Sequence, residues 1–193
     1  MARKAAVSRD TLETQITVEV DLDGSGIAEF DTGIPFLDHM LDQVARHGMI
    51  DLRIKAVGDL HIDDHHTAED TALALGRALD QALGDREGIA RFGYAYAPLD
   101  EALARVVIDL SGRPYSEVDL GLTRETLGEL ACENITHFLR SFAVASRSTL
   151  HVDVLRGEND HHRAEATFKA LALALRNAIA LVGGGVPSTK GVL

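Results

Sequence analysis

The hydrophobic positions of this chain follow two periods, and the order in which those periods occur is repeated once. Gln15–Leu22 alternates apolar and polar side chains, as a half-buried strand does, and Asp-Gly-Ser-Gly at 23–26 predicts a hairpin into a second strand. A helix is predicted near Pro35–His47, a strand over Ile50–Val57, and a long helix from Asp64 to about Leu83. The first half therefore reads strand, strand, helix, strand, helix.

The second half has the same order after a break at Gly84–Gly88. Its predicted elements are strands around Ala102–Asp109 and Tyr115–Asp119, the helix Leu127–Val144, the strand Thr149–Leu155 and the helix Asp160–Leu181. The long helices are rich in Ala and Leu over most of their surface, so we expect them to be packed between sheets. We predict an α+β fold with a single domain over 1–193, pseudo-repeats at about 1–87 and 88–182, and a C-terminal tail at 183–193.

A histidine-rich motif occurs twice, once at the start of each long helix. Residues 64–69 read Asp-His-His-Thr-Ala-Glu, and residues 160–165, 96 positions later, read Asp-His-His-Arg-Ala-Glu. Asp64 and Asp160 are predicted as N-caps, which places each His pair in the first turn of its helix. The glutamate three and four positions later lies on the same face. Successive helical residues point about 100° apart, so we expect one His of each pair to face each metal.

Two further histidines extend the repeat. His39 lies 26 residues before His65, and His137 lies 24 residues before His161, both within apolar helix-like runs. Three His and one Glu are thus available for each of two metals, a nitrogen and oxygen ligand set without thiolate that suits Mn, Fe, Ni or Zn. The alternative is that these are capped helix starts carrying ordinary surface histidines. Repetition of the whole set favours metal binding.

Charge and composition limit the partners. The chain of 193 residues has 30 acidic and 19 basic side chains and a net charge of −11, which disfavours nucleic acid and anionic membranes as partners. An anionic substrate would need a local cluster of Arg or Lys. The single cysteine, Cys132, is expected to be buried. The N-terminal residues show no apolar signal segment and no run has membrane-spanning length, so we expect a cytoplasmic enzyme.

Seven motifs, in order, resemble the imidazole glycerol-phosphate dehydratase family over essentially the whole chain. They are Arg9–Thr14, Gly33–Leu41, His65–Asp70, Gly88–Gly93, Ser111–Tyr115, His161–Ala170 and Pro187–Leu193. The resemblance implies the manganese-dependent dehydratase of histidine biosynthesis, with two duplicated halves and a helical layer sandwiched between two sheets. It also implies a 24-subunit shell in which sites with two Mn²⁺ ions form between subunits.

The resemblance also implies roles for single residues. The metal ligands map onto His39, His65, His66, Glu69, His137, His161, His162 and Glu165. Glu13 is the implied acid/base residue, and the implied substrate contacts are Glu13, His47, Arg91, Arg113, Lys169, Ser188, Thr189 and Lys190. Which four ligands hold which metal stays open. His61 and His151 have no counterpart in the other half, so a structural role is expected for them.

The implied reaction removes water from imidazole glycerol phosphate and gives imidazole acetol phosphate. The hydroxyl next to the ring is a poor leaving group and the adjacent C–H is scarcely acidic. Two metals on the two ring nitrogens would stabilise the imidazolate, which can expel hydroxide and leave a diazafulvene-like species with an acidic C–H. A carboxylate can then take that proton, and the enol relaxes to the ketone.

Two other functions remain as alternatives at this point. A manganese phosphoesterase also uses Asp-His-His and would need further aspartates upstream. Asp21 and Asp23 have a suitable spacing, although they run into the Gly-rich turn and have no copy beside the second motif. A metal-storage or metal-sensing shell would bind metal without Glu13, Arg91 or the Ser-Thr-Lys tail.

Overall fold

The computed structural model describes residues 2–191, so Met1 and the last two residues of the predicted tail lie outside it. The first half forms a four-stranded sheet from β1 (Lys4–Asp10), β2 (Thr14–Asp21), β3 (Ala28–Asp31) and β4 (Asp51–Gly58), in the order β1-β2-β4-β3. The second half forms a sheet from β5 (Phe92–Leu99), β6 (Ala102–Asp109), β7 (Tyr115–Asp119) and β10 (Thr149–Arg156), in the order β5-β6-β10-β7. The two sheets have equivalent strand orders, which confirms the duplicated halves.

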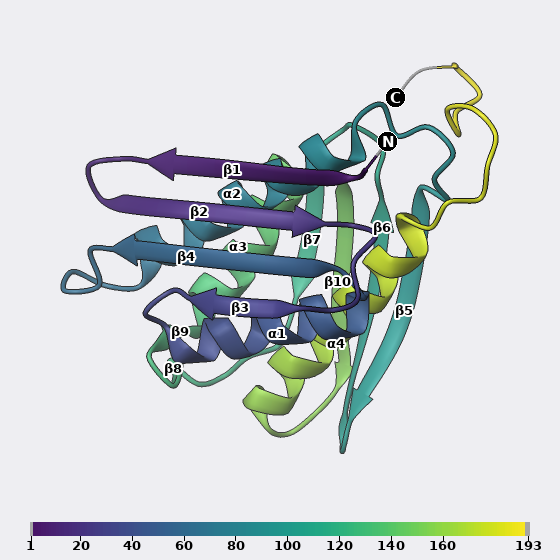
Figure 1. The fold of residues 1–193 in the computed structure, drawn as a ribbon. Coiled ribbons are helices and arrows are strands. Elements are labelled where there is room, and N and C mark those ends of the chain that lie inside the picture. The colour runs from purple at the N-terminus through teal and green to yellow at the C-terminus, as the bar shows by residue number, and fades with distance from the viewer. Residues whose placement is uncertain (1, 192–193) are drawn as a thin grey trace.

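Four helices lie between the two sheets (Figure 1). They are α1 (Pro35–Gly48), α2 (His65–Leu83), α3 (Cys132–Ala145) and α4 (Asp160–Ala178). Helices α1 and α2 pack on the first sheet and α3 and α4 on the second, while α1 contacts α4 and α2 contacts α3 across the layer. This arrangement confirms the predicted helical layer. Within residues 2–191, no helix is both long enough and apolar enough to cross a bilayer.

Strands β1 and β5 were not among the predicted elements. The side chains of β5 explain why its sequence does not resemble that of an ordinary strand. Its inward side chains are small, because Gly93, Ala95 and Ala97 face the closely packed α4, where a Cβ on Gly93 would collide with the carbonyl oxygen of Ala174. Its large side chains, Tyr94 and Tyr96, point outward and are exposed. The alternation therefore runs opposite to that of an ordinary half-buried strand, in which large apolar residues face the core.

The predicted hairpin at 23–26 is wrong. Strand β3 pairs in parallel with β4, and β4 lies between β2 and β3, so the Gly-rich segment is a loop that crosses the end of β4. The Asp51 carboxylate holds this loop by accepting hydrogen bonds from the N–H groups of Ser25 (2.7 Å), Gly26 (3.1 Å) and Ile27 (2.9 Å). A turn sequence records that the chain bends, but not which strand lies beside it afterwards.

Helix ends also differ from the prediction. Helix α3 begins at Cys132 rather than Leu127, because residues before it form the small hairpin β8 (Thr126–Leu127) and β9 (Leu130–Ala131). Helix α4 ends at Ala178 rather than Leu181, which instead bridges to Ile89. Cys132 is buried, as expected.

The N-cap prediction is right in position for α2 and wrong for α4. The side chain that caps α4 belongs to Asn159, whose Oδ1 accepts from the N–H of His161, and Asp160 is the first helical residue. Asp64 stands at the N-cap position of α2, but its carboxylate accepts from the N–H of Ala131 rather than from an N–H of its own helix. Both aspartates are used to tie a long helix to a neighbouring loop.

Asp51 gives a pH-dependent prediction. Hydrogen bonds from the N–H groups of Ile27 and Ser25 lower the pKa of Asp51 below its ordinary value. Its ionised form therefore stabilises the fold above the unfolded-state pKa of about 3.9, and this contribution is lost as the pH falls through the lower folded-state pKa. Asp51→Asn should reduce the free energy of unfolding by about 1 kcal/mol near neutral pH.

The difference between wild type and Asp51→Asn should shrink as the pH falls from about 4 through the lowered folded-state pKa of Asp51, because the protonated carboxyl is uncharged like the asparagine side chain. Urea unfolding of both chelator-treated proteins, at neutral pH and in acid, measures this difference in the free energy of unfolding. An equal difference at both pH values contradicts the role assigned to the Asp51 carboxylate.

Candidate metal centre

The first group of candidate ligands combines α1 and α4. We call it the His39 cluster: His39, His161 and Glu165, whose ligand atoms all lie within 4.8 Å of one another. The Nε2 atoms of His39 and His161 lie 3.2 and 3.1 Å from Oε2 of Glu165. His161 and Glu165 are one helical turn apart on α4, and the packing of α1 on α4 supplies His39.

Glu165 is an anion within this cluster. Burial alone would raise the pKa of Glu165, but hydrogen bonds from Lys169 and His39 outweigh it and bring the pKa down to about 2. The Lys169 ammonium lies 2.7 Å from the other carboxylate oxygen, Oε1. The cluster thus offers a carboxylate and two imidazole nitrogens to a cation.

The second group combines α2 and α3 in the equivalent way. We call it the His137 cluster: His65, Glu69 and His137, again within 4.8 Å. Oε1 of Glu69 lies 3.1 Å from Nε2 of His137, and Oε2 lies 3.8 Å from Nε2 of His65. The two imidazole rings are stacked with centroids 4.9 Å apart.

Two observations on the His137 cluster fit a metal ion. Nδ1–H of His65 donates a hydrogen bond to Oδ1 of Asn134 at 2.9 Å, which leaves the Nε2 lone pair for the cluster. Nε2 of His137 is buried beside Oε1 of Glu69, 3.1 Å away, but the two atoms form no well-directed hydrogen bond within residues 2–191. A cation bound between them would satisfy both atoms.

The second histidine of each pair lies outside both clusters. We call His66 and His162 the outer histidines; their rings stand at 77° and 87° to those of His65 and His161. Nδ1 of His66 lies 3.0 Å from Oδ2 of Asp59 and 3.7 Å from Oε2 of Glu13. The hydrogen bond with Asp59 raises the pKa of His66 above its ordinary value. The members of each pair therefore face different surroundings, as the 100° step between helical neighbours predicts.

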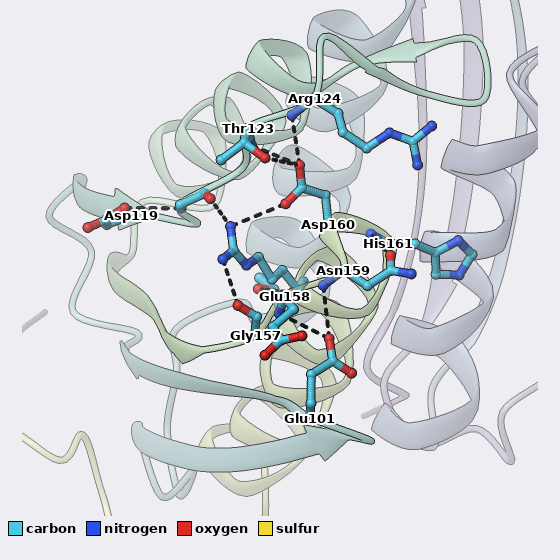
Figure 2. A network of polar contacts seen from close by, with 12 residues as sticks. Glu101, Asp119, Thr123, Arg124, Gly157, Glu158, Asn159, Asp160 and His161 are labelled. Atoms are coloured by element: carbon cyan, nitrogen blue, oxygen red, sulfur yellow. Dashed lines mark hydrogen bonds and ion pairs between the residues drawn. The ribbon is translucent and has the colours of Figure 1, made fainter.

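The other outer histidine, His162 at the start of α4, is held by the carboxylate of Glu101 from the β5–β6 turn. Nδ1 of His162 lies 2.8 Å from Oε2 of Glu101, while Oε1 of Glu101 accepts from the N–H groups of Glu158 (3.1 Å) and Asn159 (2.9 Å) (Figure 2). The backbone hydrogen bond from Asn159 and the bond from His162 lower the pKa of Glu101 to about 2. The same hydrogen bond raises the pKa of His162.

A second carboxylate fixes this end of α4 to the β7–β8 loop. Oδ2 of the buried Asp160 accepts from the N–H groups of Thr123 (2.8 Å) and Arg124 (2.7 Å) and from the Thr123 hydroxyl (3.0 Å) (Figure 2). Burial would raise the pKa of Asp160, but these bonds lower it. The helix start that carries His161 and His162 is therefore held on two sides.

Glu13 lies in the turn between β1 and β2 and is exposed. Asp59, Asn134 and Glu101 contact the histidines but were not among the residues singled out from the sequence. Glu101 lies in the β5–β6 turn, which is equivalent to the β1–β2 turn that holds Glu13, but this equivalence became visible only in the structure because β1 and β5 were not predicted. Asp59 and Asn134 gave no signal in the sequence.

The candidate phosphate-binding residues are spread over several sites. Arg91 donates to both carboxylate oxygens of Asp109, at 2.7 and 3.0 Å, and to the carbonyl oxygen of Pro187 at 2.7 Å. The tail is further tied by the N–H groups of Gly88 and Val182, which bond to the carbonyls of Gly185 and Gly88. Residues 182–187 thus lie beside the segment from Gly88 to Arg91.

The remaining predicted contacts are exposed or outside the clusters. Arg113, Thr189 and Lys190 are exposed, and the Ser188 hydroxyl accepts from the N–H of Lys190 at 3.2 Å. His47 is exposed near the end of α1, about 12 Å along the helix from His39, and joins neither cluster. His61 is exposed, and His151 lies beside Tyr115 with ring centroids 5.8 Å apart.

Known proteins resemble this chain over almost its full length. The family model of imidazoleglycerol-phosphate dehydratase matches residues 32–175. The imidazoleglycerol-phosphate dehydratase of Pseudomonas paraeruginosa is 57% identical over 99% of this chain and 98% of its own length.

Two solved structures have a similar fold. The imidazoleglycerol-phosphate dehydratase of Staphylococcus aureus is similar with a TM-score of 0.83 and 36% identity, over 92% of this chain and 99% of that one. The enzyme of the same name from Pyrococcus furiosus also has a TM-score of 0.83, with 39% identity over 97% of this chain and 100% of that one.

The contacts of Arg91 predict a change in the tail. Arg91→Ala should raise amide hydrogen exchange across 182–188, because it removes the hydrogen bond to Pro187 and the link to Asp109. The matched control is Arg113→Ala, whose side chain is exposed and makes no hydrogen bond or ion pair within residues 2–191. Exchange measured by mass spectrometry should rise about tenfold in the first variant only. Equal protection in both would show that the tail is held by its backbone bonds alone.

Proposed function

Because the chain belongs to the imidazoleglycerol-phosphate dehydratase family of hydro-lyases, we propose that it converts imidazole glycerol phosphate into imidazole acetol phosphate and water in histidine biosynthesis. The observation that carries the proposal is the pair of equivalent His-His-Glu clusters, one in each half of the chain. An imidazole ring has two nitrogens on opposite sides. Two similar cation sites suit such a ring better than one site does.

The donor set supports two divalent ions in each active site. Imidazole nitrogen and carboxylate oxygen without thiolate is a typical ligand set for Mn²⁺ in catalytic sites, and we propose Mn²⁺. The His39 cluster and the His137 cluster would each supply three ligands, and an outer histidine would complete each set. The buried Nε2 of His137, which faces the Glu69 carboxylate at 3.1 Å without a well-directed hydrogen bond, supports this assignment.

The outer histidines support sites that lie between subunits. Each cluster has three ligands from one chain, while His66 and His162 are turned away and held by Asp59 and Glu101. We propose that the outer histidines complete clusters on neighbouring copies, within the 24-subunit shell that the family resemblance implies. One chain then contributes ligands to more than one active site.

The chain's own residues supply the proton transfer and the substrate contacts. Two bound ions would withdraw electron density at the ring nitrogens and favour the imidazolate form. Breaking the C–O bond next to the ring releases hydroxide and leaves the neighbouring C–H acidic. Glu13 would take this proton, because its carboxylate is 54% exposed and belongs to a turn beside His66. The enol that remains tautomerises to the ketone.

Cations and hydroxyl groups would hold the phosphate. We assign this role to Arg91, Arg113, Ser188, Thr189 and Lys190, with His47 as a further substrate contact. Lys169 is ion-paired with Glu165, which places its ammonium group beside the His39 cluster. It would therefore contact the phosphate or the glycerol part of the substrate at that cluster. Guanidinium groups suit phosphate because they can donate two parallel hydrogen bonds.

The phosphoesterase alternative lacks its additional aspartates. Asp21 pairs with Lys4 at 2.7 Å and Asp23 pairs with Arg3, and neither joins a cluster of candidate ligands within residues 2–191. The storage alternative leaves Glu13 and the ordered tail without a role.

Removal of metal tests the proposal directly. Protein stripped with a chelator should lose turnover of imidazole glycerol phosphate, and added Mn²⁺ should restore it, because no protein group can provide the proposed Lewis-acid withdrawal. Ketone formation and phosphate release are followed in parallel. Phosphate release would favour the phosphoesterase alternative, and full turnover in metal-free protein would exclude the proposed role of the ions.

Glu13 is tested separately from the metal. Glu13→Gln should lower kcat by about 10²–10⁴-fold, since the amide cannot accept the substrate proton. The bound metal, measured by elemental analysis, should stay at the wild-type value because Asp59 is the nearer partner of His66. A near-wild-type kcat would dismiss Glu13 as the base.

A further inference from the structure

The duplication places a glutamate in each of two equivalent hairpin turns. Glu13 lies in the β1–β2 turn and Glu101 in the β5–β6 turn, and β1-β2 is the counterpart of β5-β6 in sheet order. Each glutamate approaches the outer histidine of its own half. The distance to Nδ1 is 3.7 Å for Glu13 and His66, but 2.8 Å for Glu101 and His162. Only the second distance is a hydrogen bond.

The two glutamates differ because the first half has an additional carboxylate. Oδ2 of Asp59 lies 3.0 Å from Nδ1 of His66 and takes the place that Glu101 occupies beside His162. Glu13 is thereby left 54% exposed and without that hydrogen bond. Glu101 has no such substitute and is engaged by His162 and by two backbone N–H groups.

We propose that Glu101 is a positioning residue for His162, that Asp59 has the same role for His66, and that this second carboxylate leaves Glu13 available for proton transfer. The inference rests on the proposed function, since it gives the outer histidines their role as ligands. It adds two residues and a reason why the duplicated glutamates differ.

The hydrogen bonds set the tautomer of His162. A carboxylate only accepts hydrogen bonds, so Nδ1 of His162 carries the proton and Nε2 keeps its lone pair for a cation. Oε1 of Glu101 is held by the N–H groups of Glu158 and Asn159, so the carboxylate is fixed relative to the start of α4 (Figure 2). The ring is therefore oriented by the same helix end that carries it.

The glutamine variant is informative because it changes this tautomer without changing size. In Glu101→Gln, the amide oxygen is best placed facing the two backbone N–H groups, which leaves the NH₂ group facing Nδ1 of His162. Nδ1 must then accept, and the proton moves to Nε2, where it blocks metal binding. Mn²⁺ affinity, measured by competition with a chelator, should fall about 10–100-fold at one of the two sites.

The matched control is Glu13→Gln, the same substitution in the equivalent turn. It should keep wild-type Mn²⁺ affinity at both sites because Asp59 still holds His66. Excess Mn²⁺ should restore turnover in Glu101→Gln but not in Glu13→Gln. With Co²⁺ as the probe, the visible absorption spectrum should change only in Glu101→Gln, reporting a lost imidazole ligand. A role confined to helix capping would lower the unfolding temperature and leave these metal readouts unchanged.

A second variant covers the case in which Glu101→Gln does not fold. Asp59→Leu should weaken the other Mn²⁺ site by a similar factor, because leucine offers no acceptor to Nδ1 of His66, and Asp59 accepts no backbone N–H of a helix start within residues 2–191. Folded Glu101→Gln or Asp59→Leu with wild-type affinity at both sites would overturn the inference. If wild type binds Mn²⁺ but fails to dehydrate the substrate, the proposed function is wrong, and the affinity measurements still decide the positioning roles.

Discussion

The crossing of α1 on α4 and of α2 on α3 is the constraint on which the candidate sites depend. Each cluster takes one histidine from one helix and a histidine and glutamate from the other, so neither exists unless the helices pack closely. Small residues make this possible: at Gly76 on α2, a Cβ would come within 2.7 Å of the carbonyl oxygen of Phe142 on α3. The need for close packing also explains the Ala-rich helices and the small inward residues of β5. Site geometry and core packing are thus one property of this fold.

Duplication supplied two similar sites, and later divergence separated their surroundings. The helices and the candidate ligands keep their equivalence, with His39, His161 and Glu165 matching His137, His65 and Glu69. The hydrogen-bonding groups around them do not: Lys169 pairs with Glu165, whereas Glu69 has His137 and His65 as its partners. A substrate with a nearly symmetric ring and an asymmetric side chain needs both properties. The equivalent ligands suit the ring, and the unequal surroundings can distinguish the two ends of the substrate.

Local ion pairs resolve the apparent conflict between an acidic protein and an anionic substrate. Two of the predicted substrate-binding cations already form ion pairs: Arg91 pairs with Asp109, and Lys169 pairs with Glu165. Such pairs fix the position of a cation before any ligand arrives, so the proposed phosphate contact would not carry the cost of ordering a flexible side chain. Arg91 also connects this charge to the C-terminal tail through Pro187.

Residue patterns alone predict the α+β class, the duplication and the repeated His-His-x-x-Glu motifs, because these depend on local periodicity and on residue types at fixed spacing. They also predict that the two histidines of each pair face apart, since helical geometry alone sets that angle. Strand order follows only from the packing of the whole chain: the turn at 23–26 carries no information that β4 inserts beside β2. The roles of Asp59 and Glu101 were decided in the same way, because hydrogen bonds between segments 7 and 61 residues apart depend on how sheets and helices pack. Local sequence sets the conformation of each segment, and only packing of the whole chain sets its neighbours.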